Sequence, residues 1–379
     1  MLKHYKEILD KARTAKLETL TAWYSLFRMK EDPFLSQISP EEIEYFVDRE
    51  NIVDAIIYDV GVASRGIPIN ILLVGPCGSG KTATLQYVYN ILKKLEQEYP
   101  EELAFNGELT STKYLFQIPE SEDNEVIEDV QPWIKKCREQ RDYLFVDDVK
   151  PEHAKIIMRE FIRTTLKVFA ISPLDFEEIY SNFPVAPKIY YLRPMSLKNT
   201  IQMLDRRIKR VLVDKEHEIT ILDLFEKEAL RILHKYGMGI PRLVLKCASK
   251  SLNLLLDVYY QDIAAITETE KQKVTVDIAM RACKITKCFQ ACIEFEKLTR
   301  TKKEVLHQVL RGPKTPTEIS LILKKDRTTI SRHLNDLKES GLVEFKPRGR
   351  ESMYEATEPA KIRFELELMP EGEKRFASA

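Results

Sequence analysis

Short apolar runs alternate with amphipathic helical segments between residues 70 and 192. The apolar runs predict strands at 70–74, 113–118, 143–148, 167–172 and 188–192. The segments between them predict helices at 83–97, 124–140 and 152–166. Because strands that alternate with helices form parallel sheets covered on both faces, this part of the chain is predicted to be an α/β domain with a parallel sheet.

Strand signals end at residue 196, and only helical periodicity follows for about the next ninety residues. The periodic segments predict a small all-α domain. Its helices are expected at 196–216, 220–236, 241–260 and 275–286.

The last part of the chain has the pattern of a winged helix-turn-helix. A helix over 304–310 is followed by Thr315-Pro316-Thr317-Glu318, a capping box with proline at the first helical position. Asp326 is predicted to cap a third helix, and the runs 342–346 and 352–356 predict a two-stranded wing. The predicted domains are an N-terminal helix (1–31), an α/β domain (32–194), a helical lid domain (195–296) and a winged helix (297–379).

Composition narrows the class of protein. The 379 residues suffice for two or three domains, and 59 basic and 59 acidic residues give no net charge, so any nucleic-acid affinity must come from a local patch. The charged N-terminus and the lack of a long apolar run favour a cytoplasmic, nucleoid-associated protein. Of six scattered cysteines, Cys283, Cys288 and Cys292 lie close together, and we interpret them as buried thiols rather than metal ligands.

A glycine-rich segment follows the first predicted strand and precedes a helix. It has the pattern GxxxxGK(S/T), in which the backbone turns tightly and presents its N–H groups to phosphates. We expect Lys81 to reach the β- and γ-phosphates and Thr82 to hold Mg²⁺. An ordinary glycine turn is the alternative, but it gives the Lys-Thr pair no role. The predicted phosphate-binding residues are Gly75, Pro76, Cys77, Gly78, Ser79, Gly80, Lys81 and Thr82.

Polar side chains end the third and fourth predicted strands, 143–148 and 167–172. Asp147 is placed to hold Mg²⁺ through water, and Asp148 to orient an attacking water. Two carboxylates at a strand end can also be simply solvated, but their place one strand–helix unit beyond the glycine-rich loop favours a Walker B motif. Ser172 ends the following strand, where a hydroxyl would face the γ-phosphate; an ordinary loop serine fits the pattern equally well.

Arg242 follows a glycine-containing turn at 237–241 and opens a predicted helix. A guanidinium group pairs two phosphate oxygens at once, so Arg242 is a candidate sensor of the γ-phosphate. A surface arginine at a helix start is the alternative.

The winged region carries a marked charge asymmetry. Residues 297–350 include 14 basic and six acidic side chains, a net charge of +8, which indicates contact with the phosphates of duplex DNA. A solvated charged face and a protein-binding winged helix are the alternatives. The third helix would present polar side chains to base edges, and the wing would add basic ones. The predicted DNA-binding residues are Arg327, Thr328, Thr329, Ser331, Arg332, Lys346, Arg348 and Arg350.

The order of these motifs resembles AAA+ ATPases of the archaeal origin-recognition and replication-initiator family over almost the whole chain. The resemblance implies an α/β P-loop (AAA+) domain, an all-α lid domain and a C-terminal winged helix-turn-helix, with ATP or ADP and Mg²⁺ as ligands. It makes Ser172 sensor 1 and Arg242 sensor 2. In that family the segment that corresponds to residues 47–50, with Val47 and Arg49, lies against the adenine.

The function expected from this resemblance is a nucleotide switch that binds duplex DNA in replication initiation. Lys81, Asp148, Ser172 and Arg242 would act in catalysis. AAA+ enzymes usually carry Glu where this chain has Asp148, so slow ATP hydrolysis is expected. The expected protein partners are a second copy of this chain or another AAA+ protein. Two alternatives stay open: a transcription regulator that uses nucleotide as a ligand, and an oligomeric ATPase that remodels or loads a protein partner.

Overall fold

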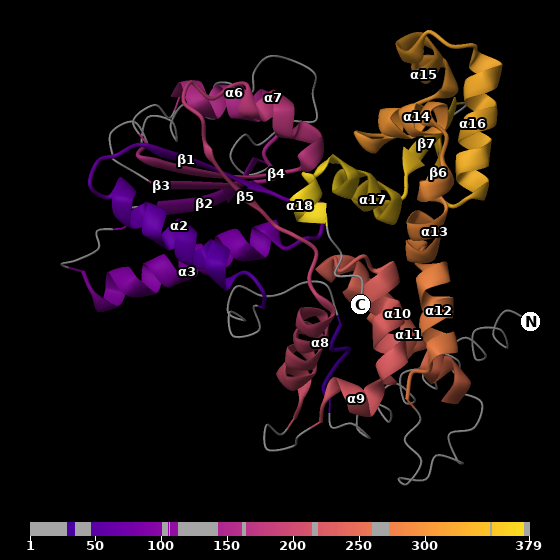
Figure 1. The fold of residues 1–379 in the computed structure, drawn as a ribbon, viewed down its shortest axis with the longest axis horizontal. Helices are drawn as coiled ribbons and strands as arrows, with labels where there is room; N and C mark the ends of the chain where they lie inside the picture. Colours follow the sequence, from indigo (N-terminus) through magenta and orange to yellow (C-terminus); the bar gives the residue numbers. More distant parts are fainter. Residues whose placement is uncertain are drawn as a thin grey trace, which may run out of the picture. The chain divides into compact units, whose positions relative to one another are not determined.

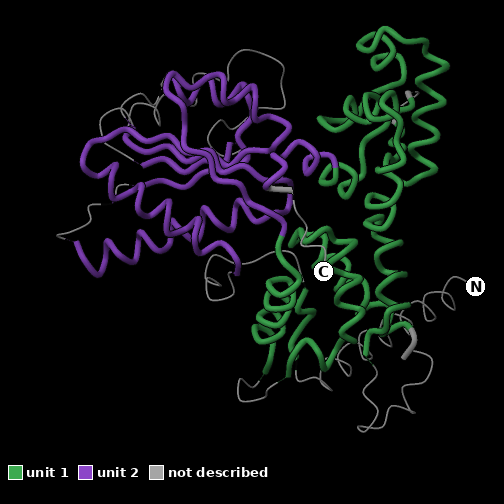
Figure 2. The backbone as a smooth tube through the Cα atoms, in the orientation of Figure 1, with its two compact units in different colours: residues 1–37, 195–363, 376–379 green, residues 38–194, 364–375 purple. Residues whose placement is uncertain are grey.

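The computed structural model describes residues 29–34, 47–100, 105, 107–112, 143–160, 164–213, 219–259, 273–348 and 351–374. The chain divides into two compact units, which Figure 2 shows in two colours. The sheet unit comprises residues 38–194 and 364–375. The helical unit comprises residues 1–37, 195–363 and 376–379. Among the described residues, no helix combines the length and the apolar character needed to cross a membrane.

In the sheet unit, the described residues form five parallel strands in the order β2-β3-β4-β1-β5. This arrangement confirms the predicted α/β class with a parallel sheet. The strands are β1 (Ile69–Val74), β2 (Gly107–Ser111), β3 (Tyr143–Asp147), β4 (Leu166–Ile171) and β5 (Lys188–Tyr191). The unit's helices before residue 195 are α2 (Glu50–Ala63), α3 (Lys81–Glu98), α6 (Pro151–Glu160) and α7 (Phe176–Tyr180).

Helices cover both faces of the sheet (Figure 1). Alternate residues of β1 point to opposite faces: Ile71 and Leu73 pack in one core with α2 and α3, and Leu72 and Val74 pack in the other with α6 and α7. Because both faces are buried, the central strands are continuous apolar runs, which is why the sequence predicts them well.

Some predicted elements of the chain lie outside the described residues. They are most of the N-terminal helix (1–31), the strand at 113–118 and the helix at 124–140. β3 pairs with β4 on one side and with β2 (Gly107–Ser111) on the other. β2 is largely half-buried and lies at the edge of the described sheet. Its sequence, Gly-Glu-Leu-Thr-Ser, has no apolar run to reveal it.

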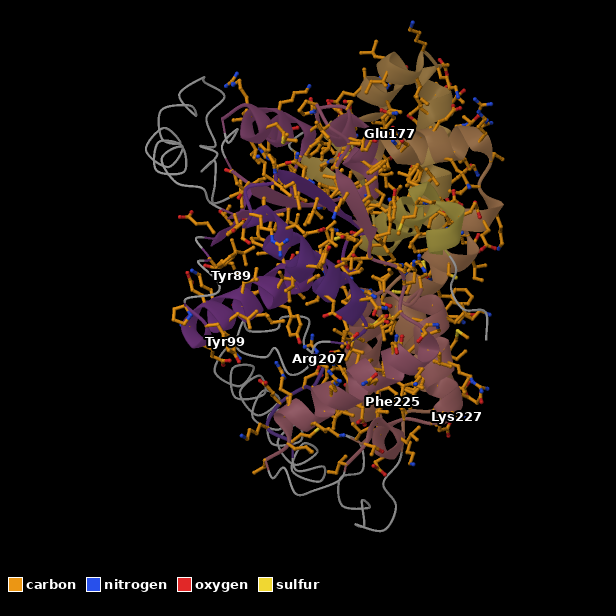
Figure 3. The ribbon with its side chains drawn as sticks, turned by 60° about the vertical axis from the view of Figure 1, so that its left-hand side comes forward. Tyr89, Tyr99, Glu177, Arg207, Phe225 and Lys227 are labelled. Carbon is orange, nitrogen blue, oxygen red and sulfur yellow. The ribbon has the colours of Figure 1, made fainter. Side chains whose placement is uncertain are left out.

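Between residues 195 and 293, the described part of the helical unit contains six α-helices. One predicted helix is in fact two, because the backbone is extended at Phe225 and the Glu226 N–H donates to the Val274 carbonyl. The Phe225 side chain, labelled in Figure 3, is buried, and its ring centre lies 5.8 Å from that of Phe34. Cys283 and Cys288 are buried thiols, as interpreted, whereas Cys292 is only half-buried. The helices are α8 (Leu197–Val211), α9 (Ile221–Leu224), α10 (Lys227–Tyr236), α11 (Pro241–Tyr259), α12 (Val276–Ile285) and α13 (Cys288–Ile293).

The winged helix-turn-helix follows in the same unit and is confirmed. Thr315 and Glu318 form the predicted capping box, and the Asp326 carboxylate accepts from the N–H groups of Thr328 and Thr329 at 2.9 and 3.1 Å. The elements are α14 (Arg300–Leu310), α15 (Pro316–Leu323), α16 (Arg327–Glu339), β6 (Val343–Arg348) and β7 (Glu351–Ala356), the last two being antiparallel.

Two further helices, α17 (Glu358–Leu368) and α18 (Glu371–Lys374), follow the wing and were not predicted. Residues 358–363 of α17 belong to the helical unit, and its residues from 364 onward belong to the sheet unit. The C-terminal end of the described chain therefore contributes to the unit that contains the parallel sheet.

Candidate nucleotide site and nucleic-acid interface

The glycine-rich segment connects β1 to α3, at the carboxyl end of the sheet's strands. Gly78 and Gly80 have φ of 75° and 99°, in the left-handed region that glycine adopts without strain. Gly75 is required for a different reason: a Cβ there would lie 2.6 Å from Ser79 Oγ and 2.9 Å from Leu192 Cβ. The sequence thus folds into a tight loop that ends at the N-terminus of a long helix, the arrangement that binds phosphates.

Lys81 folds back over this loop. Its Nζ donates to the carbonyl oxygens of Gly75 and Pro76 at 2.7 and 3.1 Å. Burial lowers the pKa of the Lys81 ammonium, and attraction by Glu365 opposes that shift. The ammonium group is therefore held at the mouth of the loop, next to the N–H groups that the loop presents.

The Thr82 hydroxyl donates to Asp147 Oδ2 at 2.5 Å. Thr82 lies in the first turn of α3 and Asp147 ends β3, so two parts of the sheet unit bring an alcohol and a carboxylate together. Hydroxyl and carboxylate oxygens are ligands that Mg²⁺ accepts. The structure thus brings together the two side chains that the sequence predicts as magnesium ligands.

Asp148, unlike its neighbour Asp147, pairs with Lys150. Its backbone is left-handed, with φ 54°, and its half-exposed carboxylate lies 3.1 Å from Lys150 Nζ. Lys150 also lies 3.7 Å from the Asp175 carboxylate. Burial alone would lower the pKa of Lys150, but these two carboxylates raise it. The sequence predicts that the Asp148 carboxylate orients an attacking water. In the structure, Lys150 competes with such a water for this carboxylate.

The Ser172 hydroxyl sits after β4, the strand between β1 and β3, and so between the glycine-rich loop and Asp147. It donates to Glu365 Oε1 at 2.8 Å and accepts from the Leu174 N–H at 3.1 Å. The other oxygen of Glu365 accepts from the Cys77 N–H at 2.6 Å. Sequence reasoning missed Glu365, which has no local motif. The helix that carries it could have been found from Thr357-Glu358-Pro359, a typical helix start.

Arg49 also contacts the glycine-rich loop. Its Nη2 donates to the carbonyl oxygens of Arg193 and Ser79, at 2.8 and 3.4 Å, and burial lowers the pKa of the guanidinium. Val47 is buried close by in the chain. The contact places this segment beside the loop, and its role in binding adenine stays a prediction.

Arg242 belongs to the helical unit, at the start of α11. Its guanidinium lies 3.5 Å from a carboxylate oxygen of Glu358, and the other oxygen of Glu358 accepts from Lys246 Nζ at 2.9 Å. Its role as a γ-phosphate sensor stays a prediction.

The loop and the strand ends fit a magnesium nucleotide. The Ser79 Oγ is buried and has no hydrogen-bond partner among the described residues, which suits a ligand that supplies one. The donor set for the metal consists of oxygens, as Mg²⁺ requires. Elsewhere in the described part of the chain, no group of three or more His, Cys, Asp or Glu side chains is arranged to hold a metal.

The candidate nucleic-acid interface is α16. Ile330, Leu334 and Leu337 are fully buried, as predicted for the inner stripe of this helix. The outer side is exposed at Arg327, Thr328 and Arg332 and half-buried at Thr329 and Ser331. A surface hollow runs along it, lined by Arg327, Thr328, Ser331, Arg332, Asn335 and Asp336.

Several basic side chains of the winged helix are paired with acids. Lys346 of β6 pairs with Glu355 of β7, and Lys302 Nζ lies 2.8 Å from Asp336 on α16. Asp336 is already included in the net charge of +8, whereas Glu355 lies outside residues 297–350 and lowers the local charge further. Arg348 ends β6, but its side chain lies outside the described part, as does Arg350.

Comparisons with known proteins give three kinds of similarity. Residues 299–344 match the family model described as "Bacterial regulatory protein, arsR family". An uncharacterised HTH-type transcriptional regulator from Methanocaldococcus jannaschii is 23% identical, over 86% of this chain and 90% of that protein. The family match corresponds to α14, α15, α16 and the start of β6.

The solved structures with similar folds include origin recognition proteins. The Aeropyrum pernix ORC1 protein in complex with DNA has a TM-score of 0.47 and 14% identity, over 84% of this chain and 93% of that chain. The Aeropyrum pernix ORC2 protein, in ADPNP and ADP complexes, has a TM-score of 0.44 and 12% identity, over 84% and 92%. The segment 299–344, within the winged helix, is thus similar to arsR-family regulators.

Proposed function

We propose that this protein binds ATP or ADP with Mg²⁺ in the glycine-rich loop, and binds duplex DNA through α16 and the wing. The observation that carries the proposal is the short contact between Thr82 and Asp147 beside the Lys81 ammonium. A hydroxyl, a carboxylate and an ammonium group gathered at a helix N-terminus suit a metal-bound polyphosphate. The nucleotide would supply the phosphate charge that these residues bind.

Within the site, each side chain has a separate task in this proposal. Lys81 leaves the loop carbonyls to pair with phosphate oxygens, and Thr82 and Asp147 hold Mg²⁺. Slow hydrolysis is supported by the position of Asp148, since a carboxylate that pairs with Lys150 is held less favourably for orienting water. The nucleotide acts mainly as a ligand that sets the state of the protein.

DNA binding rests on the exposed side of α16. Arg327 and Arg332 stand on a helix whose inner stripe is buried and whose N-terminus is capped, so the helix is presented as a rigid element. An arginine pairs bidentately with guanine in the major groove, and threonine and serine hydroxyls accept or donate to several bases. We expect a sequence preference at α16 and a sequence-independent contribution from the wing.

Two cellular uses fit this pair of activities. The resemblance in motif order favours replication initiation. The relative named a transcriptional regulator, which matches over most of both chains, and the arsR-family match favour control of transcription instead. A footprint on genomic DNA separates them, because an initiator protects repeated sites at an origin and a regulator protects promoters. An oligomeric ATPase acting on proteins would require turnover that rises steeply with protein concentration.

The test of the proposal compares Lys81→Ala with Lys94→Ala. Lys94 lies on the same helix and is exposed, so it serves as the matched control. A fluorescent ATP analogue should bind the wild type and the control, and lose most of its affinity for Lys81→Ala. DNA affinity should change on adding nucleotide in the wild type and not in Lys81→Ala. Absence of nucleotide binding by the wild type would rule out the proposal.

A further inference from the structure

The carboxylate of Glu365 occupies the phosphate-binding loop. It is 1% exposed and bridges two donors of the sheet unit, the Cys77 N–H at 2.6 Å and the Ser172 hydroxyl at 2.8 Å. Cys77 lies within the glycine-rich loop, and Ser172 ends the strand next to β1. A carboxylate is an anion with two acceptor oxygens, so it satisfies these donors in the way that phosphate oxygens would.

A carboxylate and a phosphate cannot both use these donors. Each N–H or hydroxyl hydrogen forms one good hydrogen bond, and two anions in a desolvated pocket repel each other strongly. Lys81 alone cannot neutralise both. Binding of a triphosphate at this loop therefore requires Glu365 to move away or to lose its charge.

Glu365 is carried by the helix that follows the wing. α17 starts directly after β7, and its first residue, Glu358, pairs with Arg242 and Lys246 of α11. Further along, Arg363 lies 3.6 Å from Glu296 and its guanidinium stands 4.9 Å from the Phe295 ring centre. The N-terminal part of α17 thus contacts residues of the helical unit. Only the C-terminal part of the helix, from residue 364, belongs to the sheet unit and carries Glu365.

We propose that Glu365 is an internal competitor for the terminal phosphate of the nucleotide, and that nucleotide binding displaces the last turns of α17 from the glycine-rich loop. This inference rests on the proposed nucleotide site and adds its regulation. The displaced segment belongs to α17, which follows the wing in the chain. Its displacement therefore links the presence of a γ-phosphate to the helix next to the proposed DNA-binding wing. Because Ser172 is the expected γ-phosphate contact, ATP competes with Glu365 more directly than ADP does.

The test measures nucleotide affinity of the full chain with Glu365→Gln. Glutamine keeps an oxygen for Cys77 N–H and a polar group for Ser172, and it removes only the charge. We expect Glu365→Gln to bind a fluorescent ATP analogue about tenfold more tightly than the wild type, a gain of about 1.4 kcal/mol. The gain in affinity for the ADP analogue should be smaller. Glu367→Gln is the matched control, since it removes a half-buried carboxylate from the same helix; its affinity should stay that of the wild type.

A second measurement uses the unaltered protein. Amide hydrogen exchange in residues 364–374 should accelerate when ATP is added, because these residues lose their contact with the loop. Exchange in α16 serves as the internal reference. This readout does not depend on whether a variant folds.

The outcomes separate this inference from the function on which it rests. If the wild type binds ATP, Lys81→Ala does not, and Glu365→Gln binds no tighter than the wild type, the competitor role is wrong and the nucleotide site stands. Unchanged exchange of 364–374 at saturating ATP also overturns it. If neither the wild type nor Glu365→Gln binds any nucleotide, the nucleotide site itself is wrong.

Discussion

The hydroxyl of Thr82 and the carboxylate of Asp147 lie 2.5 Å apart although 65 positions separate them in the chain. One stands in the first turn of a helix and the other at the end of a strand, and the parallel sheet brings them together. Their contact is the place that we propose for a divalent cation.

Replacing Thr82 by Val should abolish the effect of Mg²⁺ on nucleotide affinity. Valine has the shape of threonine but offers no oxygen, so the metal loses a ligand while the loop is retained. We expect at least about a tenfold loss of affinity in Mg²⁺, and little change in EDTA. Thr82→Ser keeps the hydroxyl and is expected to behave as the wild type. Equal Mg²⁺ dependence in the valine variant would remove Thr82 from the metal site.

Replacing Asp148 by Asn should slow ATP hydrolysis without changing nucleotide affinity. Asp148 is 54% exposed and contacts Lys150, and asparagine tolerates the same left-handed backbone, so the fold is retained. Single-turnover hydrolysis and equilibrium binding, measured on the same preparation, check this. A hydrolysis rate equal to that of the wild type would mean that another group orients the water.

The wing and α16 should contribute differently to DNA binding. Arg348→Ala combined with Arg350→Ala is expected to weaken binding to all sequences and to lower the salt slope by about one unit for each lost phosphate contact. Arg332→Ala should instead relax sequence preference, by about 1–3 kcal/mol between the best and a mutated site. Anisotropy titrations at several salt concentrations measure both. An unchanged salt slope in the wing variant would favour a winged helix that binds protein.

Lys167 should make the stability of the sheet unit depend on pH. Burial in β4 lowers the pKa of Lys167 to about 8 from 10.5, and its Nζ donates to the Thr164 carbonyl at 2.9 Å. Between these two values the unfolded chain binds more protons than the folded one, so the free energy of unfolding rises as pH increases from about 8 to 10. Below pH 8 both states are protonated and the whole cost of burying the charge remains.

The corresponding variant is Lys167→Met, which keeps the length of the side chain and removes the charge. It should be more stable than the wild type at pH 7, by on the order of 3 kcal/mol or less, and the difference should shrink towards pH 10. Lys155→Met, at an exposed position of α6, is the control and should show no such trend. Urea unfolding at both pH values measures the effect. A difference that is the same at pH 7 and pH 10 would contradict the assignment.

Features encoded by neighbouring residues were predictable from the sequence. The glycine-rich loop, the capping box at Thr315 and the Asp326 cap depend on a few adjacent positions, and the structure has them where the pattern indicates. The central strands were predictable for the same reason, since burial on both faces gives continuous apolar runs.

Features that depend on distant contacts were not predictable. The break at Phe225 depends on a backbone pairing with Val274, and no local signal marks it. Asp148 has a left-handed backbone and an ion pair with Lys150, and the Asp-Asp pattern predicts neither. Glu365 reaches the candidate site only because a helix after the wing returns to the sheet unit, and nothing in its flanking residues points to the loop.

The return of α17 to the sheet unit also limits how the protein can be dissected. Cutting the chain after the wing at Ala356 spares the glycine-rich loop itself, yet it deletes a side chain that contacts Cys77 and Ser172. Fragments prepared in this way would report an intrinsic affinity that the intact molecule never displays. Likewise, an affinity tag appended behind residue 379 stands close in the chain to the helix whose Glu365 contacts the glycine-rich loop, so N-terminal fusions are preferable for assays.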